Sequence, residues 1–163
     1  TAIKSLHKLS LARPVEFTIY GHIEEENYFR LLKRGFVQSP NQSIRYGGVL
    51  RPTEIKEVYA KANYMFMPTE HENYGHAIVE AWACGCPVII SKNTPWLALQ
   101  DKKIGWDVSL EHKEDLIAAL QEAVDLGQEE YFEMVDKTFQ FFADNLAAEK
   151  VIESNKELFH NVS

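Results

Sequence analysis

The sequence is short of cysteine, of basic residues and of long apolar runs, and each shortage excludes a class of protein. Its two cysteines, Cys84 and Cys86, are too close together to staple a fold, so reduced thiols in a cytosolic protein are the simpler expectation. Seventeen basic residues against 24 acidic ones leave a net charge of −7, which argues against general nucleic-acid binding because that needs a basic face. No apolar run approaches the roughly 18 residues of a membrane span, and no secretory signal is visible. The cysteines thus predict a cytoplasmic protein, and because the chain opens at Thr1 rather than at Met, a segment upstream could still carry a secretory signal.

What the sequence does contain is an alternation of short apolar runs with helical patterns, in a chain that is 45% apolar. The runs that predict strands are residues 15–21, 43–50, 64–69, 87–91 and 105–110. The helical patterns are residues 24–37, 51–62, 73–84 and several from 111 onward. Strands and helices that alternate at this pace predict right-handed crossovers and a parallel sheet in an α/β fold.

The two ends of the chain are helical in pattern. Ile3, Leu6 and Leu9 have helical spacing, yet no strand precedes them, so we expect the chain to be a piece of a longer protein that begins inside a βα unit. A last helix is expected over residues 151–159. No internal repeat or flexible linker divides residues 1–163, so they predict a single domain.

The stretch EHENYGHAIVEAWACGCPVII, residues 70–90, carries the chemistry. It follows the strand predicted at 64–69, and open parallel sheets bind ligands at the carboxyl ends of their strands. Asn73 is a plausible cap for the helix that follows. Gly75 lets backbone N–H groups approach a ligand closely because it has no Cβ. Free N–H groups and the helix dipole favour a phosphate or a polar sugar at this point.

Two glutamates, Glu72 and Glu80, lie on either side of this glycine. Glu72 precedes the helix and is expected over its N-terminus, whereas Glu80 is two turns in, on the face that also carries His76. The opposite face, around Trp82, is expected to pack on the sheet. Carboxylates accept hydrogen bonds from vicinal hydroxyls, as sugars present them. The alternative is that both glutamates are solvated surface residues.

Residues 68–88 resemble the donor-site signature of the retaining glycosyltransferases of family 4, which have the GT-B fold. In that signature a strand ends in Pro-Ser or Pro-Thr, followed by Glu-Gly-Phe-Gly and then by Glu-Ala-Met-Ala-x-Gly-x-Pro-Val. Here the corresponding residues read Pro-Thr, Glu-Asn-Tyr-Gly and Glu-Ala-Trp-Ala-Cys-Gly-Cys-Pro-Val. The resemblance implies a Rossmann-like αβα sandwich, the C-terminal half of a GT-B glycosyltransferase, with the N-terminal acceptor domain outside this chain.

The resemblance also implies roles for particular residues. Glu72 would be catalytic, contacting hydroxyls of the donor sugar and favouring positive charge at the anomeric carbon, and Glu80 would bind the ribose hydroxyls. The other residues implied in donor binding are Asn73, Tyr74, Gly75 and His76 through their N–H groups, Leu50 and Arg51 beside the base, and Gly21 in the turn after the first strand. Asn73 replaces the usual glycine, and the loop at 93–96, NTPW, replaces Gly-Gly-x-Pro-Glu, so the resemblance leaves the sugar open.

The activity implied is transfer of a sugar from a nucleoside diphosphate to a glycan or lipid-linked acceptor, with retention and without a bound metal or other cofactor. Family members build polysaccharides, which implies the cytoplasmic face of a membrane. The family's diphosphate-binding arginine and lysine would lie before Thr1, so this chain alone is expected to be inactive, to bind donors weakly and to self-associate through its last helix. The alternatives are a nucleotide-sugar epimerase of the same fold and a non-catalytic nucleotide-sugar-binding module.

Two further features have competing interpretations. His71 and His76 are five apart, one more than the zinc-protease pattern allows, which argues against a metal site. Trp82 is expected in the core. Trp96, in a loop, is equally compatible with packing and with stacking on a sugar ring or base.

Overall fold

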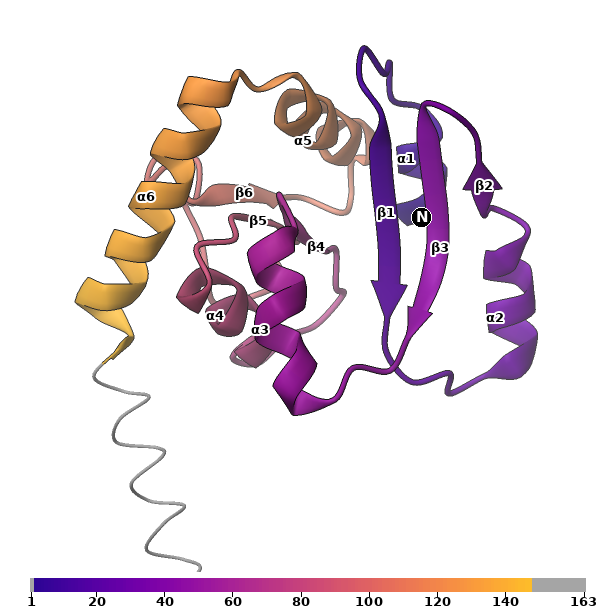
Figure 1. The fold of residues 1–163 in the computed structure, drawn as a ribbon, viewed down its shortest axis with the longest axis horizontal. Coiled ribbons are helices and arrows are strands. Elements are labelled where there is room, and N and C mark those ends of the chain that lie inside the picture. The colour runs from indigo at the N-terminus through magenta and orange to yellow at the C-terminus, as the bar shows by residue number, and fades with distance from the viewer. Residues whose placement is uncertain (1, 148–163) are drawn as a thin grey trace, which may run out of the picture.

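The computed structural model describes residues 2–147, which form an α/β fold (Figure 1). The helices are α1 (Ala2–Leu6), α2 (Glu26–Lys33), α3 (Pro52–Lys61), α4 (His76–Ala83), α5 (Lys113–Asp125) and α6 (Gln128–Asn145). The strands are β1 (Val15–Tyr20), β2 (Val37–Gln38), β3 (Gln42–Gly48), β4 (Met65–Met67), β5 (Val88–Ser91) and β6 (Gly105–Val108). Each of the five predicted strands is present, and the helix predicted at 151–159 lies outside the described residues. Within residues 2–147 no helix is long and apolar enough to cross a bilayer.

The strands form two three-stranded sheets, where one parallel sheet was expected. In the first, ordered β1-β3-β2, β1 runs parallel to β3 and the short β2 runs antiparallel to it. In the second, ordered β4-β5-β6, all strands are parallel. The sequence pattern does not predict β2, because it places Val37 at the end of a helix. That helix, α2, instead ends at Lys33. Gly35, just after it, packs closely on α1, because a Cβ added to Gly35 would lie only 2.6 Å from Ile3 Cγ2.

The two sheets share one layer of core. Buried residues of α1 and α5 pack with Ile44 of β3 and with Ile89 and Trp106 of the second sheet. Phe17 of β1 and Phe66 of β4 meet edge to face, with ring centroids 5.7 Å apart. A second cluster lies on the other face of the β4-β5-β6 sheet, beneath α4 and α6. The helices therefore cover both faces of this sheet, as an αβα sandwich requires, and the predicted fold class is confirmed.

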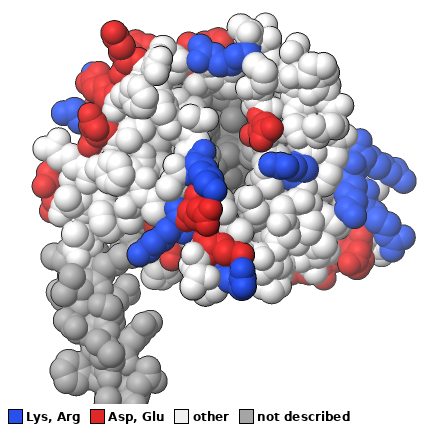
Figure 2. Space-filling model, viewed as in Figure 1, with Lys and Arg blue, Asp and Glu red and all other residues white. Residues whose placement is uncertain are grey.

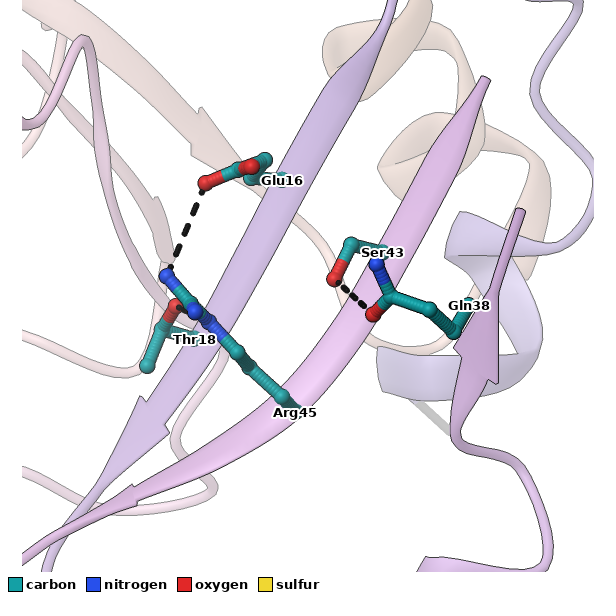
Figure 3. A network of polar contacts seen from close by, with 5 residues as sticks. All are labelled: Glu16, Thr18, Gln38, Ser43 and Arg45. Carbon is teal, nitrogen blue, oxygen red and sulfur yellow. Dashed lines mark hydrogen bonds and ion pairs between the residues drawn. The ribbon is translucent and has the colours of Figure 1, made fainter. Parts of the chain in front are cut away.

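The first sheet is polar on its other face. Arg45 of β3 donates to Thr18 Oγ1 of β1 (3.2 Å) and lies 3.6 Å from the Glu16 carboxylate (Figure 3). Ser43 donates to Gln38 Oε1 at 2.8 Å, which ties β3 to β2. The arginine and the glutamate are largely exposed, so their ion pair contributes little to stability. Figure 2 shows basic and acidic side chains interspersed on the face drawn there, so the net charge of −7 is not gathered into one patch on it.

Candidate functional site

Two loops leave the same edge of the second sheet, since β4 and β5 are parallel neighbours. The loop after β4 leads to α4, and the loop after β5 contains Trp96. Three hydrogen bonds join them: Glu72 N–H to the Asn93 carbonyl (3.2 Å), Trp96 Nε1–H to the Tyr74 carbonyl (2.6 Å), and the Ser91 hydroxyl to the Thr69 carbonyl. The predicted site residues 72–75 therefore lie on a loop that is tied to the end of β5 and the loop after it, at the carboxyl end of a parallel sheet, and His76 follows as the first residue of α4.

Glu72 turns its carboxylate back onto its own loop. Its Oε1 accepts the N–H of Gly75 at 3.0 Å and, more loosely, the N–H of Tyr74 at 3.4 Å. Sequence reasoning offers both N–H groups to the ligand, and in this structure Glu72 occupies them. One carboxylate oxygen thus fixes the side chain beside the N-terminus of α4, while Oε2 accepts no hydrogen bond within residues 2–147.

The start of α4 differs from the prediction. The expected cap was Asn73, but the helix begins at His76 and its N-cap is Gly75, in the left-handed conformation (φ +81°) and without a side-chain cap. The physical reason is that Gly75 can adopt a positive φ that reverses the chain just before the helix. The first two helical N–H groups, those of His76 and Ala77, have no acceptor within the described chain. Sequence reasoning missed Ala77 because it started the helix three residues too early.

Glu80 lies two turns into α4, on the helix face that sequence reasoning assigned to it. The opposite face is fully buried, with Ile78, Ala81 and Trp82 each 0% exposed. Burial, and to a lesser degree the Glu80 charge, raise the pKa of Tyr59 on α3 to about 12. The Glu80 carboxylate is half-buried, yet it accepts no hydrogen bond and forms no ion pair within residues 2–147. It is available to hydroxyl donors of a ligand.

The remaining predicted residues lie at the ends of β1 and β3. Gly21 (φ +142°) donates to the Gly48 carbonyl at 3.0 Å, and its own carbonyl accepts the Tyr46 hydroxyl at 2.6 Å. The N–H of Arg51 is already bound by Glu54 Oε2 (2.8 Å), whereas the N–H of Leu50 has no acceptor in the described part of the chain. Of the pair expected beside the base, Leu50 is therefore the one with a free donor.

The helix α3 connects these two groups of residues. It begins directly after Arg51, and its Tyr59 lies close enough to α4 for the Glu80 charge to act on it. The hydrogen bond from the Arg51 guanidinium to Glu54 lowers the pKa of that carboxyl to about 2. At the start of α3 these two side chains therefore form an ion pair with each other. A ligand that reached both groups would run along α3.

Aromatic rings surround the loop. Trp96 meets Tyr74 (5.7 Å) and the buried Trp82 (5.0 Å) edge to face, and Tyr74 also lies 4.8 Å from the His76 ring. The predicted core position of Trp82 is confirmed. Trp96 uses its indole N–H within the protein, which favours packing over stacking on a ligand.

No metal-binding cluster is formed by the described residues: no three His, Cys, Asp or Glu side chains within 2–147 are grouped as ligands. His71 lies in the loop after β4 and His76 is the first residue of α4. Cys86 is buried, which raises the pKa of its thiol to about 12 and disfavours the thiolate that binds metals.

Comparison with known proteins gives the family. The family described as glycosyl transferases group 1 matches residues 1–140. The O-antigen chain mannosyltransferase B of Escherichia coli is 31% identical over 81 residues, which are 50% of this chain and 20% of that protein. Two crystal structures of Anabaena Alr3699/HepE share the fold. The structure in complex with UDP has a TM-score of 0.71 and 15% sequence identity, and the match covers 98% of this chain and 44% of that one. The structure in complex with UDP-glucose has a TM-score of 0.70 and 12% sequence identity, and the match again covers 98% of this chain and 44% of that one.

The chain spans less than half the length of each of these relatives. The match to the family nevertheless covers most of the chain, including both sheets and the loop that carries Glu72. The chain belongs to the glycosyl transferases group 1 family.

Proposed function

We propose that this chain is the donor-binding domain of a retaining, family 4 glycosyltransferase that moves a sugar from a nucleoside diphosphate to a glycan or lipid-linked acceptor. The observation that carries the proposal is the Glu72 carboxylate held at the N-terminus of α4, with the unpartnered, half-buried Glu80 two turns further on. The structural relative HepE was crystallised in complex with UDP and with UDP-glucose, which supports a nucleoside diphosphate sugar as the donor.

The leaving diphosphate is the group that most needs stabilisation, because negative charge builds up on it as the bond to the sugar breaks. The free N–H groups of His76 and Ala77 at the positive end of the α4 dipole are suited to that charge. Glu72 Oε2 would face the sugar and favour positive charge at its anomeric carbon. In this proposal the negative charge develops beside the N-terminus of α4 and the positive charge develops beside Glu72, and both groups are in place before the donor binds.

The rest of the donor follows from the same placement. Glu80 would accept both ribose hydroxyls, and the Leu50 N–H would meet the base, on the far side of α3. Gly21, with its left-handed turn, would let the backbone approach the donor closely. None of these proposed contacts with the donor requires a bound metal. The acceptor domain and the basic residues for the diphosphate would belong to a longer protein, working at the cytoplasmic face of a membrane.

The test begins with a thermal-shift panel of uridine, guanosine and adenosine diphosphates and their sugar conjugates. We expect the 163-residue chain to bind one nucleotide series weakly, at high micromolar or worse, and the full-length enzyme to bind it more tightly. The full-length enzyme should then transfer the sugar with the anomeric configuration of the donor, as read by NMR of the product. Conversion of the nucleotide sugar without an acceptor would indicate the epimerase instead, and binding without turnover would indicate a binding module.

A further inference from the structure

We infer that Trp96 is a positioning residue, which holds the Tyr74–Gly75 peptide so that this peptide in turn holds Glu72. The indole N–H of Trp96 donates to the Tyr74 carbonyl at 2.6 Å. The N–H of the same peptide unit, that of Gly75, donates to Glu72 Oε1 at 3.0 Å. One peptide group thus connects Trp96 to Glu72.

The geometry of the peptide explains why the two contacts depend on each other. A trans peptide is planar, and its C=O and N–H point in opposite directions; residues 2–147 contain no cis peptide. When Trp96 fixes the carbonyl, the N–H can only point to the other side, where the Glu72 carboxylate lies. Rotation of this unit is otherwise easy, because it adjoins a glycine. Hydrogen bonds to the two ends of one peptide also polarise it and strengthen each other.

Trp96 is itself firmly placed. Its ring lies edge to face on Trp82, which is fully buried, and Trp82 packs in the same way on Phe141 of α6 with centroids 5.2 Å apart. Its backbone N–H is bound by the Thr94 hydroxyl at 3.2 Å. Trp96 therefore links the loop after β4 to the packed core around Trp82.

The sequence offers a matched pair of substitutions to test this. Trp96→Phe keeps an aromatic ring beside Trp82 but removes the N–H that holds Tyr74. Trp106→Phe removes an indole N–H that is buried and has no acceptor within residues 2–147, so it costs no hydrogen bond. The first variant loses the contact and the second loses only ring size, in a strand away from the loop.

The primary measurement is the amide proton shift of Gly75 in NMR spectra of the isolated chain, which needs no ligand. An N–H bonded to a carboxylate resonates downfield. We expect Trp96→Phe to move the Gly75 resonance upfield to the position seen in Glu72→Ala, and Trp106→Phe to leave it unchanged. If Gly75 keeps its wild-type shift in Trp96→Phe while Glu72→Ala moves it, the inference is wrong.

The consequence for sugar transfer rests on the proposed function. In the full-length enzyme, Trp96→Phe should lower kcat about tenfold, the order expected for one lost hydrogen bond that supports a charged group. The affinity for the bare nucleoside diphosphate should stay within about twofold, since Glu72 faces the sugar. An equal loss of nucleotide affinity would show that Trp96 contacts the donor itself. Failure of the wild type to bind any nucleotide would overturn the proposed function but not the NMR result.

Discussion

Glu80 is a half-buried carboxylate to which no donor from residues 2–147 is bound. A ligand that brings hydroxyls to this carboxylate would form new hydrogen bonds with it, and hydrogen bonds to charged groups contribute about 1.5–3 kcal/mol each. We therefore expect Glu80→Ala in the full-length enzyme to weaken nucleotide binding tenfold or more, by calorimetry, since about 1.4 kcal/mol is a factor of ten.

Two controls separate this role from others. Glu72→Ala should mainly lower turnover and leave the affinity for the bare nucleotide. Glu57→Ala removes an exposed carboxylate of α3 that pairs only with Lys61 among the described residues, and it should change nothing in binding. Equal nucleotide affinity in wild type and Glu80→Ala would contradict the ribose assignment.

The buried thiol of Cys86 makes stability depend on alkaline pH. Its pKa is raised by burial from 9.0 to about 12, so between these values the folded protein keeps a proton that the unfolded chain releases. Stability must then fall as pH rises, by up to about 1.4 kcal/mol per pH unit for one proton. Urea unfolding between about pH 8 and about pH 11 should show this fall, and Cys86→Ala should flatten it. Tyr59, which is half-buried and whose pKa is also raised to about 12, leaves a residual slope.

Between β4 and α4, the element boundary depends on one glycine. Gly75 has φ +81°, and a Cβ there would lie 2.7 Å from Ile78 Cδ1 and 3.4 Å from Trp96 Nε1. Gly48 has a similar φ of +88°, but a Cβ there would meet nothing within 4 Å. Gly48→Ala should therefore cost only the left-handed strain of about 1–2 kcal/mol, and Gly75→Ala should cost more in urea unfolding. Equal losses of unfolding free energy in the two variants would show that the side chains around position 75 move aside without cost.

How far the sequence predicts these elements depends on whether the cause is local. The apolar run of β5 and the two faces of α4 follow from residue spacing, so they are predicted correctly. The start of α4 is not, because Asn73 is a good cap by local rules, whereas the helix is capped by the left-handed Gly75. The carbonyl of the preceding Tyr74 is bound by Trp96, 22 residues further along the chain. The carboxylate of Glu72 is predicted to face a ligand, and its bond to the Gly75 N–H depends on a loop shape that no spacing rule encodes.

At the scale of the whole molecule, β1 and β4 are each paired on one side only among the described strands, and they belong to different sheets. Phe17 and Phe66 bring these two strands together through their side chains. We predict that a longer version of the protein, extended upstream through a strand, places that strand between β1 and β4 and completes one sheet. It should unfold at higher urea concentration and bind nucleotides more tightly than residues 1–163, and an extension of scrambled sequence should do neither.

The division into two sheets also determines the order in which the parts of the molecule unfold. β5 is paired on both sides and all four of its residues are buried, whereas the first sheet is joined to it by packing without a backbone ladder among the described strands. The two sheets share a layer of core but no backbone ladder among the described strands, so we expect each sheet to unfold as a cooperative unit of its own. On warming, the unit around β1 and β3 should melt first and leave β4, β5 and β6 folded, so that calorimetry records two transitions in place of one.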